Sequence, residues 1–303
     1  MKRIVLLILI AMLFVTESYA QQDPQYTQYM YNMNVVNPAY AGSRETLSIG
    51  VLGRTQWTGL IGAPKTLTFS IHAPFSEKVG LGLSVIADEI GPVKEQNIYA
   101  DFSYTLQTSE NGKFAFGLKG GVTLTNADLL LRTVNPDPTF SDNVNSTNPN
   151  FGAGAFYYTD KFYVGLSVPN FLEVTTAEFE NSQISKVSES MHYFLTTGYV
   201  FDLSTNLKFK PSTLVKVVSD APMSIDLSAN FLFNEKFELG TSYRLDDSIS
   251  ALATFEISRG FRIGYAYDHT VSNLGDFNNG SHEAFLLWDI FSAERKIHSP
   301  RFF

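Results

Sequence analysis

Apolar and polar residues alternate one by one along most of this chain. In one typical stretch, Phe114, Phe116 and Leu118 fall on one face of an extended backbone, while Lys113 and Lys119 fall on the other. A period of two indicates half-buried β-strands. No long segment keeps the period of a helix, so the pattern predicts an all-β protein.

The alternating stretches number fourteen. They predict strands at 45–53, 65–75, 79–87, 95–106, 113–125, 150–158, 161–168, 190–201, 206–218, 223–233, 236–245, 248–257, 261–268 and 282–290. Most come close to the roughly 9–11 residues that a tilted strand needs to cross a membrane.

The connections between these stretches differ in length in a regular way. One set is short, as at 76–78 and 159–160, and the set that alternates with it is mostly longer, as at 126–149 and 169–189. Outer-membrane barrels have short periplasmic turns and longer outer loops, whereas a soluble β-sandwich does not require this alternation. We therefore expect a transmembrane antiparallel β-barrel of about 14 strands over residues 45–290, with both chain ends on the periplasmic side.

The first twenty residues have the features of an export signal. Lys2 and Arg3 precede an apolar run, and Ser18 and Ala20 supply small residues at the positions that a signal peptidase reads. The run holds about 12 residues, which is short for a membrane span. We expect residues 1–20 to be a signal peptide that is cleaved after Ala20, and the mature protein to reach the outer membrane.

Composition and motifs argue against several other classes of protein. The net charge of −8 makes nucleic acid an unsuitable partner, and the absence of cysteine excludes disulfides and thiolate chemistry. No two of the five histidines have a metal-ligand spacing, and no nucleophile elbow, phosphate-binding loop or dinucleotide fingerprint is present. We expect no catalytic residue, no cofactor and no metal, and so no enzyme.

Two sequence blocks carry a family resemblance. The stretch QQDPQYTQYMYNMNVVNPAYAGSRE contains Asn37-Pro38-Ala39-Tyr40-Ala41-Gly42, and the next loop contains Arg54, Gln56-Trp57 and Gly62-Ala63-Pro64. Together they closely resemble the start of the PorP/SprF family, the outer-membrane proteins of the type IX secretion and gliding machinery of Bacteroidota. The stretch Gly280 to Ile290 resembles the last strand of that family. The middle of the chain shares only the pattern of strands and turns.

The resemblance implies a function as well as a fold. Members of the family are outer-membrane barrels without known catalysis that serve the export and cell-surface attachment of large proteins, such as gliding adhesins, that carry a type IX C-terminal signal. The implied partners are such an exported protein, other type IX secretion components and outer-membrane lipid. The alternative is a passive channel or a FadL-like carrier of small hydrophobic molecules, since barrels of this size have open or plugged lumens.

The segment between the signal and the first strand is unusual for a linker. Asn37-Pro38 and Ala41-Gly42 are turn dipeptides, yet Val35, Val36 and Tyr40 are apolar and need burial. We expect residues 21–44 to pack as a plug or latch inside the periplasmic half of the barrel, although a loose leader is the alternative. Residues 291–303 form a basic C-terminal tail that we expect in the periplasm.

Arg54, Gln56 and Trp57 stand where the first strand meets the first outer loop. Exposed Trp and Arg residues are typical anchors of binding surfaces, so these three are candidates for docking the exported protein. The alternative for Trp57 is a place in the aromatic girdle at the lipid interface. The long polar loops 126–149 and 169–189 are either recognition loops or a cover for the lumen.

Overall fold

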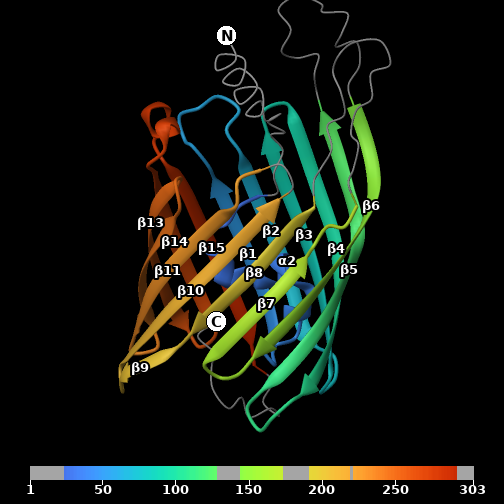
Figure 1. The fold of residues 1–303 in the computed structure, drawn as a ribbon, viewed down its shortest axis with the longest axis vertical. Coiled ribbons are helices and arrows are strands. Elements are labelled where there is room, and N and C mark those ends of the chain that lie inside the picture. The colour runs from blue at the N-terminus through green and yellow to red at the C-terminus, as the bar shows by residue number, and fades with distance from the viewer. Residues whose placement is uncertain (1–23, 128–143, 173–190, 219–220, 292–303) are drawn as a thin grey trace, which may run out of the picture.

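The computed structural model describes residues 24–127, 144–172, 191–218 and 221–291. The predicted signal peptide, its cleavage site and the C-terminal tail after residue 291 lie outside these residues. Antiparallel strands follow one another around a closed wall, because β1 pairs with both β2 and β15, and β10 pairs with β11. The result is a β-barrel with tilted strands (Figure 1).

The strands are β1 (Leu47–Thr55), β2 (Lys65–Pro74), β3 (Val79–Ile90), β4 (Val93–Gln107), β5 (Lys113–Ala127), β6 (Val144–Tyr158), β7 (Phe162–Val168), β8 (His192–Tyr199), β9 (Phe201–Ser204), β10 (Leu207–Val218), β11 (Ser224–Phe233), β12 (Phe237–Arg244), β13 (Ser248–Ser258), β14 (Phe261–Thr270) and β15 (Ser281–Ile290). Short helical turns are η1 (Tyr29–Tyr31), α2 (Met33–Val36), η2 (Pro38–Tyr40) and η4 (Asn273–Phe277). In the part of the chain that is described, no helix has the length and apolar character needed to cross a bilayer.

The predicted count of fourteen strands is confirmed, because two of the fifteen segments form one strand of the wall. Both β8 and β9 pair with β10. They are interrupted at Val200, whose backbone N–H donates to the Lys161 carbonyl at 2.7 Å, an ordinary hydrogen-bond distance. The barrel therefore has an even number of strands around its circumference.

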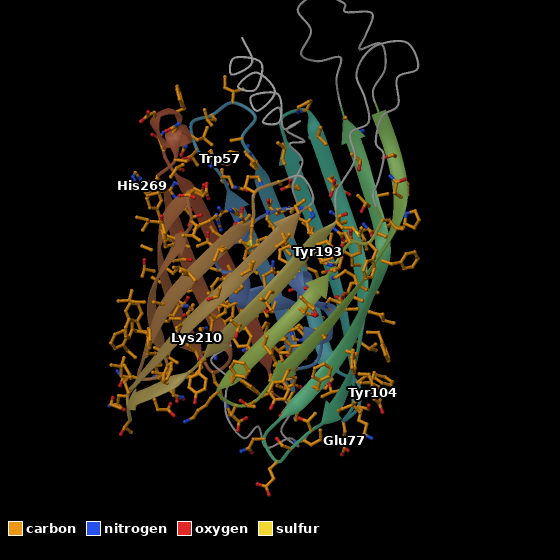
Figure 2. All side chains as sticks on the ribbon, viewed as in Figure 1. Trp57, Glu77, Tyr104, Tyr193, Lys210 and His269 are labelled. Atoms are coloured by element: carbon orange, nitrogen blue, oxygen red, sulfur yellow. The ribbon has the colours of Figure 1, made fainter. Side chains whose placement is uncertain are left out.

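The two ends of the barrel differ, as the connection lengths predict. Glu77 lies in a short turn at one end, which we call the short-turn end, and Trp57 lies in a longer loop at the other, which we call the long-loop end (Figure 2). The prediction was wrong for the start of β6. This strand begins at Val144 rather than at residue 150, so six residues expected in a polar loop continue the ladder with β5.

Side chains sort by polarity between the two faces of the wall. On β5, Phe116 and Leu118 point outward and are 54% and 62% exposed, while Lys119 points inward and is buried. The same alternation runs around the barrel and gives it an apolar outer face and a polar interior. That is the arrangement a bilayer requires, because lipid contacts the outer face and closure satisfies the backbone hydrogen bonds.

The chain before β1 lies inside the wall. Residues 24–46, which we call the luminal segment, contain η1, α2 and η2, and nearly all of their side chains are buried or half-buried. Their hydrogen bonds reach strands on all sides of the barrel, including β2, β4, β7, β11 and β15. Figure 1 shows α2 within the barrel, behind β7 and β8.

The path of the luminal segment differs from the predicted one. Gln25 donates to Ser224 at the start of β11, close to the long-loop end, whereas Gly42 packs against Pro74 and Gly80 beside a short turn. The segment therefore runs along the length of the barrel instead of staying in the half beside the short turns. This route could not be predicted, because turn dipeptides and apolar residues indicate bends and burial but not the direction in which the segment runs along the barrel.

Candidate functional site

The luminal segment is attached to the wall near the long-loop end through Arg54. The guanidinium of Arg54 lies 2.8 Å from Asp268 and 3.0 Å from Glu283, and it donates to the hydroxyl of Thr27 at 2.9 Å. Glu283 also accepts the backbone N–H groups of Thr27 and Gln28, at 2.9 and 2.7 Å. All five residues are buried. One inward-facing cation and two carboxylates thus bind the first turn of the segment.

A second attachment lies near the short-turn end. Arg44 contacts the Asp289 carboxylate with two nitrogens, at 2.9 and 2.5 Å, and Ser48 donates to the same carboxylate at 2.6 Å. Burial alone would lower the pKa of Arg44, but the Asp289 carboxylate raises it, so the guanidinium stays charged. A bidentate pair of this kind fixes orientation as well as distance. The luminal segment is therefore held at both ends of the barrel.

The middle of the segment makes a third set of polar contacts. Asn34 donates to Asp101 on β4 at 3.0 Å, and Asp101 in turn pairs with Lys119 on β5 at 2.8 Å. Across the lumen, Tyr31 donates to Glu238 on β12. Burial raises the pKa of the neighbouring Tyr29 hydroxyl above its ordinary value, so that group stays neutral.

The family-like motif at residues 37–42 also contacts the wall directly. Asn37 caps η2 by accepting the Ala39 N–H at 3.0 Å, and its amide donates to the Ala155 carbonyl of β6 at 3.0 Å. The Ala41 carbonyl accepts from Ser103 at 2.6 Å, and the Gly42 N–H donates to His72 at 3.1 Å. The motif is thus a bent segment whose polar groups bond to three strands of the wall, β2, β4 and β6.

Glycines on the wall make room for this motif. A Cβ atom at Gly117 would lie 2.1 Å from the backbone nitrogen of Ala39, and one at Gly154 would lie 2.1 Å from the side-chain oxygen of Asn37. Both distances are far below an ordinary van der Waals contact, so only glycine permits the approach. Close packing against the luminal segment is therefore the reason for glycine at these two positions.

The three predicted docking residues do not form one exposed surface. Arg54 is 3% exposed and points into the lumen, so in this conformation it cannot serve as an exposed anchor. Gln56 and Trp57 lie in the following loop and are half-buried. Trp57 has a φ of +44° and donates its backbone N–H to Ser281 at 3.1 Å. Docking stays a prediction for Gln56 and Trp57 alone.

Several residues of the luminal attachments were not singled out from the sequence. They are inward-facing charges on strands, namely Asp101, Lys119, Asp268 and Asp289. A charged residue at an inward position of a strand with otherwise apolar and small residues could have predicted these attachments, because a buried charge needs a partner. His282, paired with Glu283 in sequence, points the other way and bonds the Tyr265 hydroxyl at 2.6 Å. Among the described residues, no group of His, Asp and Glu is arranged to hold a metal ion.

One small apolar cavity lies beside the luminal segment. It has a volume of about 40 Å³ and is lined by residues that include Tyr26, Val36, Phe194 and Leu214.

Comparison with known proteins identifies a protein family. The family described as "Type IX secretion system membrane protein PorP/SprF" matches residues 18–288 of this chain. No curated protein matches the sequence closely enough to count as a relative.

Solved structures with a similar course of the chain are outer-membrane proteins. The Acinetobacter baumannii outer membrane protein Omp33 has a TM-score of 0.45 and 9% identity, over 82% of this chain and 100% of that one. A Pseudomonas aeruginosa FadL homologue has a TM-score of 0.46 and 12% identity, over 81% and 89%. The KdgM porin has a TM-score of 0.38 and 11% identity, over 80% and 99%.

Proposed function

Starting from the fact that this chain belongs to the PorP/SprF family of type IX secretion system membrane proteins, we propose that it holds large exported proteins at the cell surface. The protein is an outer-membrane β-barrel of the secretion system. In the proposed role it binds an exported protein, or the C-terminal signal domain of one, and so supports both secretion and attachment. Adhesins of the gliding machinery are the proposed class of cargo.

The observation that carries this proposal is the occupied lumen. The luminal segment is bound near both ends of the barrel, by Arg54 with Glu283 and by Arg44 with Asp289. A barrel whose interior is filled by its own chain is suited to holding a partner on its surface rather than to conducting solutes. In this role residues 21–44 act as a plug, and the long-loop end faces the outside of the cell.

The proposal predicts a specific loss in cells that lack the protein. Cells would be treated with a protease or a membrane-impermeant label, and surface proteins that carry a type IX C-terminal signal would be quantified. We expect at least one large protein of this kind to disappear from the surface and to return when the gene is restored. An unchanged surface population in the deletion strain would contradict the proposal.

The second candidate function is a passive channel or a carrier of hydrophobic small molecules. The apolar cavity beside Tyr26 and Phe194 is the observation in its favour. Conductance of the purified barrel in a planar bilayer separates the two functions. A large open conductance of the full chain favours the channel, and no conductance favours the plugged anchor.

A further inference from the structure

The luminal segment runs through the barrel with its first residues toward the long-loop end. Near that end, Thr27 bonds to Glu283 on β15 and to Asp268 on β14, and near the other end, Arg44 bonds to Asp289 on β15. Glu283 and Asp289 belong to the same strand, and their separation in sequence corresponds to about 20 Å along it at 3.3 Å per residue. The direction of the segment through the lumen is therefore fixed by these two attachments.

The residues around the start of the segment lie at strand ends beside the long loops. Gln25 donates to the hydroxyl of Ser224, the first residue of β11, at 2.8 Å. Pro24 and Gln25 also line the apolar cavity described above, together with Pro169, the residue directly after β7. Pro24 and Gln25 therefore lie at the mouth of the barrel on the long-loop side.

Solvent reaches the luminal segment mainly at its two ends. Pro24 and Gln25 are half-buried, and so are Arg44 and Glu45 at the opposite end. Between them, every residue from Tyr26 to Ala41 is buried except Tyr31, which is half-buried. This distribution fits a segment that fills the lumen and reaches the surface at each mouth, with Pro24 at the long-loop mouth.

The attachment at Thr27 keeps the start of the segment at that mouth. Glu283 accepts two consecutive backbone N–H groups, those of Thr27 and Gln28, and the Thr27 hydroxyl bonds to both Arg54 and Asp268. A shift of the segment toward the short-turn end would remove these donors from a buried carboxylate, which is energetically unfavourable.

The chain that precedes Gln25 is too short to return through the lumen. With the signal peptide cleaved after Ala20, as the sequence predicts, the mature chain begins at Gln21. The peptide from Gln21 to Gln25 spans at most about 14 Å when fully extended, which is less than the roughly 25 Å height of the apolar band of an outer-membrane barrel. The first residue of the mature chain then lies on the same side of the membrane as Pro24.

We propose that the mature chain begins at the long-loop mouth of the barrel, so that its amino terminus faces the outside of the cell. This inference rests on the proposed function for the orientation of the barrel, in which the long-loop end faces outward. It replaces the expectation that both chain ends lie on the periplasmic side. The C-terminal end keeps the expected side, because β15 ends at Ile290, which follows the Asp289 that binds Arg44. The start of the mature chain thus belongs to the surface that meets an exported protein.

Single cysteines report the side of the membrane on which a position lies, because the natural chain contains no cysteine. Pro24→Cys places one thiol at the start of the segment, and Gln25→Cys is a second variant at the neighbouring position. Folding of both is checked by the heat-dependent mobility of the barrel on gels. Intact cells and cells with a permeabilised outer membrane would be treated with a maleimide that does not cross that membrane. We expect each variant to be labelled to the same extent in the two samples.

Two exposed positions serve as controls for the two sides. Ile61 is 92% exposed in the long loop after β1, so Ile61→Cys should be labelled in intact cells. Glu77 is exposed in the short turn after β2, so Glu77→Cys should be labelled only after permeabilisation (Figure 2). Labelling of Pro24→Cys and Gln25→Cys only after permeabilisation would overturn the inference. Failure of both to be labelled in either sample would also overturn it, since the start of the segment would then be closed to the outside.

The controls separate this inference from the function on which it rests. If Ile61→Cys is labelled in intact cells and Pro24→Cys is not, the long-loop end faces outward, the mature chain begins elsewhere, and the proposed function stands. If Glu77→Cys is labelled in intact cells and Ile61→Cys only after permeabilisation, the barrel has the opposite orientation, and both the inference and the proposed function fail.

Discussion

Gly117 on β5 and Ala39 in the luminal segment are in direct backbone contact. If Gly117 carried a Cβ atom, that atom would lie 2.1 Å from the Ala39 backbone nitrogen. No side chain can occupy that space while the segment keeps its position. The wall and the luminal segment are therefore complementary in shape at this contact. A single larger residue at position 117 should separate them.

Gly117→Val should displace the luminal segment and leave the barrel intact. The added side chain competes with the Ala39 backbone, whereas the ladder from β5 to β4 and β6 does not depend on it. Limited proteolysis of the folded protein in detergent should cut within residues 24–46 at least about tenfold faster than in the unaltered protein, since such cleavage follows the population of the open form.

Gly120→Ala is the control for that substitution. It adds a methyl group on the same strand, where the nearest atom is 3.7 Å away on the Phe151 side chain, so the luminal segment should stay protected. Rapid cleavage of residues 24–46 in the unaltered protein would contradict the plug, because it would show that the segment is a loose leader.

Arg54→Ala should destabilise the barrel strongly. The substitution leaves the carboxylates of Asp268 and Glu283 buried without their cation, and removing one partner of a buried ion pair costs about 3–5 kcal/mol. The free energy of unfolding by denaturant in lipid vesicles measures the loss.

Lys161→Ala provides the comparison for a pair on the surface. Lys161 lies 2.7 Å from Asp202, but both side chains are exposed and screened by water, so we expect no measurable change. Equal stabilities of Arg54→Ala and Lys161→Ala would show that the luminal cluster does not stabilise the fold.

The sequence predicted the wall of this barrel better than its interior. Alternation of the kind seen at Phe116 and Leu118 is imposed by lipid on one side, so it marks each strand inside the apolar band. It fails at Asn145 and Thr147, because both faces of β6 carry polar residues there. Arg54 was predicted as an exposed anchor because it lies next to a loop in the sequence. Its inward orientation, and its contacts with Asp268 and Glu283 more than 200 residues later in the chain, could not be predicted from that position.

Trp57→Ala should reduce the amount of exported protein at the cell surface. Trp57 is partly exposed in an ordered loop at the long-loop end, where the proposed partner is held, and large aromatic residues often dominate such contacts. We expect at least about a tenfold weaker attachment, measured by surface labelling at equal barrel levels, since a dominant contact contributes about 2 kcal/mol or more.

Trp288→Ala is the matched control for the other tryptophan. Trp288 is 51% exposed on β15, on the lipid-facing side of the wall, so its loss should not change attachment. If both substitutions have the same effect, Trp57 belongs to an aromatic girdle and the docking prediction is wrong.

Affinity purification of the tagged barrel from outer membranes, with identification of the proteins that accompany it, tests the central claim most directly. The account predicts that at least one large exported protein with a type IX C-terminal signal co-purifies in a defined ratio and is absent from a purification of an unrelated outer-membrane barrel. Recovery of the barrel without any protein of that kind would contradict the claim that it holds exported proteins at the cell surface.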